Sequence, residues 1–148
     1  MRTTIAQVYL RLSLSAGFLW FGLDRLGAWG PYGKPWVSWG DWAHFSDRAH
    51  HLMGFLPGGL AECFAVIATI IEVGGGLLLL VGLGTRWAAL ACSAMTLCFA
   101  LAMSITDGIL SPLGYSVFTA SAASLLLSTL PSYAVSVDAL ISAGRRRR

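Results

Sequence analysis

The stretch Ala65–Val81 is so apolar that it fits a lipid bilayer better than water, yet Glu72 lies near its middle. An ionised carboxylate at the centre of a membrane helix costs about 3 kcal/mol or more, so such a residue normally faces the protein interior and has a partner there. Two hypotheses follow for Glu72. Either it belongs to a functional site, or it ties two helices together and has no chemical role.

Composition places the whole chain in the membrane class. Of its 148 residues, 56% are hydrophobic and 11% are charged, whereas soluble domains carry roughly 25% charged residues. Four apolar stretches approach the ~20 residues that cross a bilayer. In lipid the backbone must satisfy its own hydrogen bonds, so these stretches are expected to be helices. The predicted spans are Ile5–Ala28, Gly59–Leu83, Trp87–Thr106 and Gly114–Leu130.

The sequence therefore predicts an all-α fold, a four-helix transmembrane bundle forming one domain over residues 1–148. The first span is expected to be a permanent helix rather than a signal peptide, because Arg11 interrupts its apolar run and no clear Ala-x-Ala cleavage site follows. Basic residues predict the orientation. Arg2, Arg86 and Arg145–Arg148 fall on one side of an even number of spans. That side, with both termini and the tail 131–148, is expected to be the cytoplasm.

The net charge of +3 is explained by this orientation in the inner membrane and by attraction to anionic lipid. Membrane lipids are therefore the expected partners of the arginine-rich tail, and no nucleic-acid partner is expected. The segment before the arginines places Ala134, Val137, Leu140 and Ile141 at helical spacing. This pattern predicts a short helix lying along the membrane surface.

The expected outer loop, residues 29–58, is rich in tryptophan, glycine and proline. Tryptophan favours the membrane–water boundary, and the glycines and prolines favour defined turns over a flexible linker. From Asp41 onward the pattern becomes helical, with Ser38 and Asp41 at the spacing of a capping box. We expect a lid over the outer mouth of the bundle, in which a turn-rich platform precedes a short amphipathic helix. Its aromatic residues are Trp29, Tyr32, Trp36, Trp39, Trp42 and Phe45.

Three polar residues of that helix, His44, Asp47 and His51, lie at i, i+3 and i+7 and could point the same way. Two imidazoles and a carboxylate can hold a divalent metal. A solvated helix face whose histidines merely titrate is the more common meaning of such a pattern. No metal site is therefore assigned.

Polar and small residues form stripes along the predicted spans. Small residues let helices approach closely and hydroxyls bond across the gap, so the stripes are expected to meet at the bundle axis. The first two spans run antiparallel, which predicts the ion pairs Arg25–Glu62 and Arg11–Glu72. Pairs of this kind are more often structural than catalytic. The stripes are Arg11, Ser15, Phe18, Gly22 and Arg25; Glu62, Ala65, Thr69, Glu72 and Gly76; Cys92, Thr96, Ala100, Met103 and Asp107; and Ser116, Ala120 and Ala123.

The cysteines argue against disulfide exchange with a quinone, because that chemistry needs a close thiol pair such as Cys-x-x-Cys. Cys63, Cys92 and Cys98 form no such motif and are expected to be small core residues. The sequence also holds no heme, flavin or iron–sulfur ligand motif. Electrons would have to come from a partner or directly from a substrate.

Several segments together resemble the DoxX family of small four-helix membrane proteins, across nearly all of residues 11–130. Gly114 stands where the family commonly has an acidic residue, which argues against a carboxylate site at that loop. The matching segments are Phe18–Gly30, Val37–Trp42, Ala68–Leu90 and Ser111–Phe118. The resemblance marks as motif positions Asp24, Arg25, Trp39, Asp41, Trp42, Glu72, Arg86 and Tyr115.

The family is associated with quinone-linked respiratory and thiosulfate-oxidising complexes, so the resemblance implies a redox context rather than a particular reaction. Under one hypothesis the protein is a subunit in quinone-linked or sulfur/thiol redox metabolism, with other redox subunits as partners and a quinone as ligand. Under the alternative it is a non-catalytic membrane anchor, assembly or lipid-binding protein.

The redox hypothesis assigns roles to particular residues. The candidate catalytic residues are Glu72, Asp24 and Arg25. The candidate ligand-binding residues are Trp39, Asp41, Trp42, Arg11, Glu62 and Tyr115. A quinone-sized ligand needs aromatic walls and a few convergent polar groups. Under this hypothesis Trp39, Trp42, Asp24 and Glu72 should therefore line one cavity, which opens toward the outer leaflet.

Overall fold

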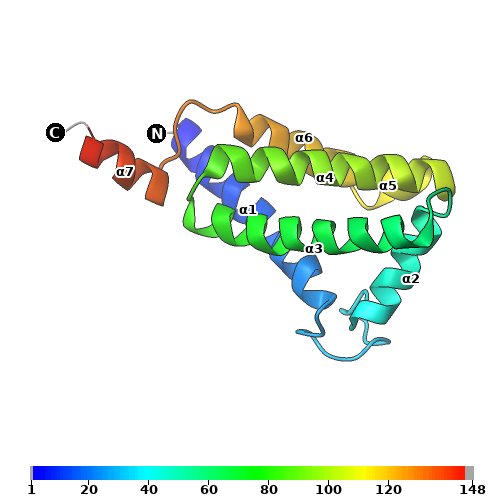
Figure 1. The fold of residues 1–148 in the computed structure, drawn as a ribbon. Coiled ribbons are helices and arrows are strands. Elements are labelled where there is room, and N and C mark those ends of the chain that lie inside the picture. Colours follow the sequence, from blue (N-terminus) through cyan, green and yellow to red (C-terminus); the bar gives the residue numbers. More distant parts are fainter. Residues whose placement is uncertain (1, 146–148) are drawn as a thin grey trace.

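A computed structural model describes residues 2–145, with side chains from residue 3 to residue 144, and shows an all-α fold (Figure 1). Residues 146–148 of the basic tail and the side chains of Arg2 and Arg145 lie outside this description. The described residues form seven helices. They are α1 (Arg2–Asp24), α2 (Trp42–Leu52), α3 (Gly58–Val81), α4 (Thr85–Thr106), α5 (Leu110–Gly114), α6 (Val117–Ser128) and α7 (Val137–Arg145).

The long apolar helices α3 and α4 lie side by side and are joined by a tight turn (Figure 1). Gly82 ends α3 with a left-handed φ of 70°, and Gly84 precedes α4 with a φ of 57°, conformations that glycine adopts without strain. Helices of 24 and 22 residues are about 36 and 33 Å long, enough for a hydrocarbon core of about 30 Å. Among the described helices, these two combine the length and hydropathy of membrane spans.

The prediction of four spans is confirmed only in part. The helix α1 is long enough, with 23 residues, but Gln7 and Arg11 make it more polar than α3 and α4. The expected fourth span is divided, because α5 ends at Gly114, Ser116 has a left-handed φ of 56°, and α6 has only 12 residues. A helix of that length measures about 18 Å, which is shorter than the hydrocarbon core.

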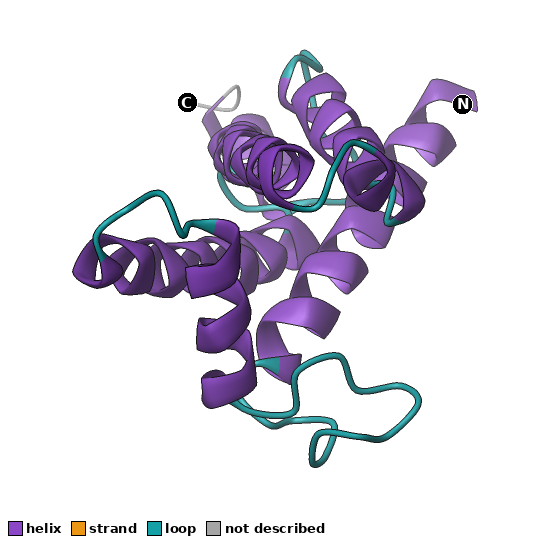
Figure 2. Cartoon of the chain, turned by 90° about the vertical axis from the view of Figure 1, so that its right-hand side faces the viewer, coloured by secondary structure: helices purple, strands orange, loops and turns teal. Residues whose placement is uncertain are grey.

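Four helices nevertheless pack around one another, since α1 lies against α3, α3 against α4, α4 against α6, and α6 contacts α1 (Figure 2). Two glycines allow the close approach of α1 and α3. A Cβ atom at Gly22 would lie 2.7 Å from Val73 Cγ2, and one at Gly76 would lie 2.8 Å from Leu19 Cγ. These contacts define the register of the two helices, with Gly22 opposite Val73 and Leu19 opposite Gly76.

The outward faces of α3 and α4 are covered by large apolar side chains. Ile70 is 65% exposed, Trp87 70% and Ile105 74%. Water-soluble proteins rarely expose continuous apolar surfaces of this kind. The faces are therefore suited to contact with lipid.

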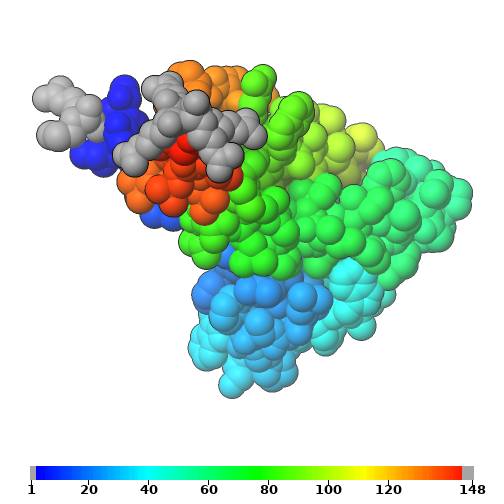
Figure 3. Space-filling view, turned by 60° about the vertical axis from the view of Figure 1, so that its left-hand side comes forward, coloured from blue at the N-terminus to red at the C-terminus, as the bar shows by residue number. Residues whose placement is uncertain are grey.

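The Trp-rich segment forms an ordered loop and then α2, as expected, and together with the end of α1 it makes a lobe beside α3 (Figure 3). The buried face of α2 consists of Phe45, Ala49 and Leu52, which confirms the predicted amphipathic helix. The capping-box spacing of Ser38 and Asp41 would make Ser38 the N-cap of this helix, which is three residues too early. Asp41 is the N-cap instead, and its carboxylate accepts the backbone N–H of His44 at 2.9 Å.

The tryptophans of this lobe have defined partners. Trp29 stacks on Trp20 with ring centres 4.6 Å apart, and its indole N–H donates to the Trp20 carbonyl at 2.8 Å. Trp39 and Trp42 both pack edge-on against Phe45. The expected aromatic lid is therefore an ordered cluster around α2.

The opposite end of the molecule holds the start of α1, the link between α3 and α4, and α7 (Figure 1). The carboxylate of Asp138 accepts the backbone N–H groups of Gly84 at 2.8 Å and Thr85 at 2.9 Å. The side chain of Gln7 accepts the N–H of Ala134 at 3.0 Å. Beyond these contacts α7 projects from the bundle (Figure 1), and its Leu140 and Ile141 are exposed. The predicted tail helix is thus present.

Candidate functional site

Arg25 and Glu72 form a buried ion pair. Arg25 Nη2 lies 2.5 Å from Glu72 Oε2, and Arg25 Nη1 donates to the Thr69 hydroxyl at 3.1 Å. Arg25 is 4% exposed and Glu72 8%. The membrane carboxylate that the sequence singles out therefore has a charged partner, which offsets the cost of removing each charge from water.

Aromatic rings close over the same arginine. The guanidinium carbon of Arg25 lies 3.8 Å from the centre of the Phe45 ring on α2 and 5.7 Å from that of Phe99 on α4. A cation near the face of an aromatic ring is attracted by the ring's quadrupole. Arg25, which directly follows α1, thus contacts α2, α3 and α4.

The predicted pairs Arg25–Glu62 and Arg11–Glu72 are wrong. The register that the two glycines define brings Arg25 level with Thr69 and Glu72, and it brings Arg11 to the C-terminal end of α3. Glu62 and Glu72 are about 15 Å apart along α3 at 1.5 Å per residue. An arginine side chain does not absorb a shift of that size.

Arg11 binds backbone carbonyls instead of a carboxylate. Its Nη1 donates to Leu79 O at 3.1 Å and its Nη2 donates to Val135 O at 2.6 Å. The last carbonyls of a helix lack intrahelical partners and carry partial negative charge, so a cation there is favourable. A Cβ atom at Gly82 would collide with this guanidinium. Arg11 therefore closes α3 and holds the segment that leads to α7.

Asp24, a candidate catalytic residue, anchors the Trp-rich loop. It is fully buried, and its Oδ2 accepts the backbone N–H groups of Ser38 at 2.9 Å and Trp39 at 2.8 Å. Hydrogen bonds to a carboxylate are among the stronger ones in proteins. The geometry gives Asp24 a structural role at the junction of α1 and the loop.

Glu62 links α3 to α2. Its two carboxylate oxygens accept the indole N–H of Trp42 at 2.9 Å and the hydroxyl of Ser46 at 2.5 Å. His50 Nε2 lies 3.7 Å from Glu62 Oε2. These contacts are all made by α2, so Glu62 holds the lid helix against the beginning of α3.

A second set of contacts links α2 to the end of α4. Arg48 forms an ion pair with Asp107, and His51 Nε2 lies 3.2 Å from Asp107 Oδ1. Burial opposes ionisation of Asp107, but the hydrogen bonds from Arg48 and His51 outweigh it and hold its pKa below the usual value. His44 contacts Asp41 instead, with 2.9 Å between Nδ1 and Oδ1.

His44 and His51 thus turn to different carboxylates and do not converge with Asp47. No group of three histidine, cysteine, aspartate or glutamate side chains gathers as a metal site within the described part of the chain.

An open apolar groove of about 380 Å³ lies between the end of α1, the lid and α3. It is lined by Leu26, Trp42, Val66, Thr69 and Ile70. Of the four residues expected to line one cavity, only Trp42 belongs to this groove. Trp39 packs on Phe45, while Asp24 and Glu72 are enclosed by their own partners.

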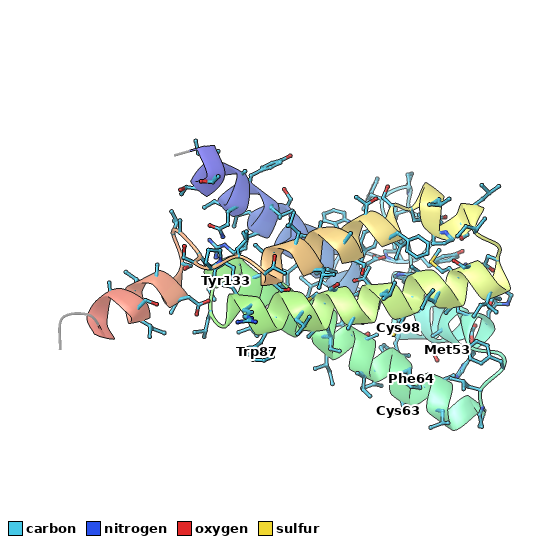
Figure 4. All side chains as sticks on the ribbon, turned by 90° about the horizontal axis from the view of Figure 1, so that it is seen from above. Met53, Cys63, Phe64, Trp87, Cys98 and Tyr133 are labelled. Carbon is cyan, nitrogen blue, oxygen red and sulfur yellow. The ribbon has the colours of Figure 1, made fainter. Side chains whose placement is uncertain are left out.

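Other predicted positions lie on the surface. Tyr115 is 78% exposed between α5 and α6. Cys63 on α3 and Cys98 on α4 are also exposed (Figure 4), so the expectation of core cysteines is right only for Cys92, which is buried. Arg86 lies beside Trp87, with its guanidinium carbon 5.9 Å from the ring centre.

The model of one protein family, DoxX, matches residues 6–105, which is more than half of the chain. The chain belongs to the DoxX family. No curated protein and no solved structure matches it. The DoxX match covers the Arg25–Glu72 pair and the Trp-rich loop, whereas Asp107, α6 and α7 lie beyond it. Together with the spans α3 and α4, the match identifies a DoxX-family membrane protein.

Sequence reasoning missed two residues of this DoxX protein: Phe99, which covers Arg25, and Asp138, which binds the start of α4. Phe99 lies next to the predicted α4 stripe, and nothing in its spacing marks it as a cover for a cation. Asp138 binds backbone groups more than fifty positions away, so no local pattern could have revealed it.

Proposed function

We propose that this DoxX protein is a non-catalytic membrane subunit of a quinone-linked or thiol-linked redox assembly, in which partner subunits carry the redox chemistry. The observation that carries the proposal is that each candidate catalytic side chain already has a structural partner. Arg25 and Glu72 neutralise each other, and Asp24 holds the loop. A general acid or base has to come within hydrogen-bond reach of a substrate, whereas Arg25 and Glu72 are turned toward each other and Asp24 is turned toward the backbone of Ser38 and Trp39.

We also propose that both termini face the cytoplasm. The start of α1, the start of α4 with Arg86, and α7 lie at one end of the bundle (Figure 1), and basic residues favour the cytoplasmic side. The stacked Trp20 and Trp29 belong to the other end, while Trp87 lies at the end with Arg86. Tryptophans at both ends are typical of helices seated between two membrane interfaces.

A second candidate function is a quinone-linked site that includes Glu72. It is favoured by the apolar groove, because Thr69 both lines the groove and accepts a hydrogen bond from Arg25. A quinone ring against Trp42 would then be one side chain away from the Arg25–Glu72 pair. In this candidate Glu72, Asp24 or Arg25 handles protons after the lid moves.

One experiment separates the two functions. The tagged protein is purified from native membranes with its partners, and electron transfer from thiosulfate or a dithiol to a soluble quinone is measured. The non-catalytic proposal predicts that Glu72→Gln, which keeps the shape of the side chain but leaves Arg25 without its charged partner, retains at least about half of the activity per assembled complex. Asp47→Asn, a change of charge at an exposed carboxylate on α2, is the matched control.

Each alternative outcome has a definite meaning. Loss of activity in Glu72→Gln alone, with unchanged yield and subunit composition, would replace the first proposal by the second. A purified complex that holds no redox partner and transfers no electrons would contradict both.

A further inference from the structure

We propose that α2 is a pH-sensitive latch, in which the neighbouring residues His50 and His51 fasten the lid to two different helices. His50 contacts Glu62 on α3, and His51 contacts Asp107 directly after α4. Adjacent residues of a helix point about 100° apart, so two consecutive histidines can reach two neighbours. The inference does not depend on the redox proposal.

The distances and exposures suit such a latch. The Nε2 atoms lie 3.7 Å from Glu62 Oε2 for His50 and 3.2 Å from Asp107 Oδ1 for His51. The imidazoles are 42% and 59% exposed, so protons from solvent reach them directly. His50 Nε2 also lies 3.2 Å from the Gly58 carbonyl, at the first residue of α3.

Protonation changes the strength of these contacts in one direction. A neutral imidazole offers a carboxylate at most one hydrogen bond, whereas an imidazolium adds a charge–charge attraction. Histidines gain this charge over the range between about pH 8 and pH 5. Acidification therefore places positive charge on α2 opposite two carboxylates and tightens the latch, and alkalinisation loosens it.

The other charged groups around α2 hold it in place whether or not the two histidines are protonated. Arg48 keeps its charge and stays paired with Asp107, so the contact with α4 is weakened rather than lost when His51 is neutral. Trp42 and Ser46 hold Glu62 by hydrogen bonds that need no imidazole charge. Around the remaining faces of α2 are its own Asp47, the local pair of His44 with Asp41, and Arg25 beneath Phe45.

Loosening α2 has a direct consequence for the buried ion pair. Phe45 covers the Arg25 guanidinium, and Trp42 forms one wall of the apolar groove. Both residues are carried by α2. The latch thus couples pH at this end of the membrane protein to the access of solvent or ligand to Arg25 and Glu72.

Hydrogen exchange of residues 42–52 tests the latch in lipid nanodiscs. Protection is measured at pH 6 and pH 8, and it is corrected for the intrinsic pH dependence of exchange with α3 as an internal reference. Exposed ion pairs contribute about 0.2–1 kcal/mol each, which for two pairs corresponds to a loss of protection of roughly two- to thirtyfold at pH 8. The double variant His50→Gln/His51→Gln should show less than about a 1.5-fold dependence.

Two single variants make the test specific. His44→Gln removes a histidine whose carboxylate partner, Asp41, caps α2 itself, so it should keep the part of the pH dependence that comes from the contacts with Glu62 and Asp107. Asp107→Asn should remove only the part of the pH dependence that comes from the contact between His51 and Asp107. Equal protection of wild-type α2 at both pH values, or an unchanged dependence in the double variant, would overturn the proposal.

Discussion

The guanidinium carbon of Arg25 lies 3.8 Å from the centre of the Phe45 ring. This contact joins the chain at the end of α1 to the buried face of the lid helix. Because the same guanidinium is paired with Glu72 on α3, the position of the lid depends on a charge buried in the membrane part of the protein. Substitutions at Arg25 or Glu72 are therefore expected to alter the packing of α2. Substitutions at Asp24, which holds the loop before α2, are expected to destabilise the helix bundle.

The first prediction concerns Asp24, which accepts the N–H groups of Ser38 and Trp39. Asp24→Asn removes the charge from both hydrogen bonds and is expected to destabilise the protein by about 1.5–3 kcal/mol. Cleavage of the 30–36 segment by a protease should become faster than in the wild type. Asp47→Asn, at an exposed carboxylate on α2, should change the melting temperature very little. Equal effects of the two substitutions would argue against the anchoring role.

The second prediction compares two glycines of α3. A Cβ atom at Gly76 would lie 2.8 Å from Leu19 Cγ, whereas one at Gly74 would meet nothing within 4 Å. Alanine is favoured over glycine in a helix by about 1 kcal/mol, but overpacking costs about 1–3 kcal/mol. Gly74→Ala should therefore raise the melting temperature in detergent, and Gly76→Ala should lower it. The register of α1 and α3 would be wrong if Gly76→Ala were as stable as Gly74→Ala.

Much of the fold could be predicted because its signals are local. The apolar lengths of α3 and α4, the helix that begins after Asp41 and the tail helix all follow from patterns within one segment. The predicted stripes on α1 and α3 are buried apart from Glu62, which is half-exposed. In α6, however, the buried residues are Ser121, Ser124, Leu127 and Ser128 rather than Ala120 and Ala123. Ser116, which the prediction places on the same stripe, is exposed at the break between α5 and α6.

The pairing of charges could not be predicted, because several registers of α1 and α3 bury small residues against each other. The close contacts at Gly22 and Gly76 decide between these registers, and they are visible only once both helices are packed. The wrong prediction of a carboxylate partner for Arg11 has the same cause. Its actual partners are backbone carbonyls, which sequence patterns do not distinguish.

The third prediction is a pH dependence at Asp138. Burial opposes its ionisation, but hydrogen bonds from the N–H groups of Thr85 and Gly84 outweigh burial and hold its pKa below the ordinary value of 3.8. A pKa depressed by folding means that ionised Asp138 stabilises the protein above that value, and that this stability is lost as the pH falls through the folded pKa.

The melting temperature is compared between wild type and Asp138→Asn from pH 6 downward. The wild type should be the more stable at pH 6, and the difference should shrink below about pH 4. Other acidic groups titrate in both proteins and cancel in the comparison. A difference that stays constant over this range would contradict the assignment.

The fourth prediction concerns orientation. Ser38→Cys and Ser142→Cys are introduced separately into a background without Cys63, Cys92 and Cys98, and intact cells are treated with a membrane-impermeant thiol reagent. Ser38 and Ser142 are both exposed on the protein surface, so labelling reports the side of the membrane. Labelling is expected for Ser38→Cys and only after lysis for Ser142→Cys. The reverse pattern would invert the proposed topology.

Arg25 and Glu72 are expected to stabilise the bundle as a coupled pair. Breaking a buried pair by removing one partner costs about 3–5 kcal/mol, because a charge is left without compensation. Arg25→Gln and Glu72→Gln should each lower stability substantially, and the double variant should lose clearly less than the two single losses combined. Arg11→Gln with Glu72→Gln is the matched control, since these residues are not in contact.

The most direct measurement is the melting temperature in detergent of the wild type, the two single variants and the double variant. The losses are expected to be non-additive for Arg25 and Glu72, which are in contact, and additive for Arg11 and Glu72, which are not. Strictly additive losses for Arg25 and Glu72 would contradict this coupling, and a non-additive cycle for Arg11 and Glu72 would restore the alternative register.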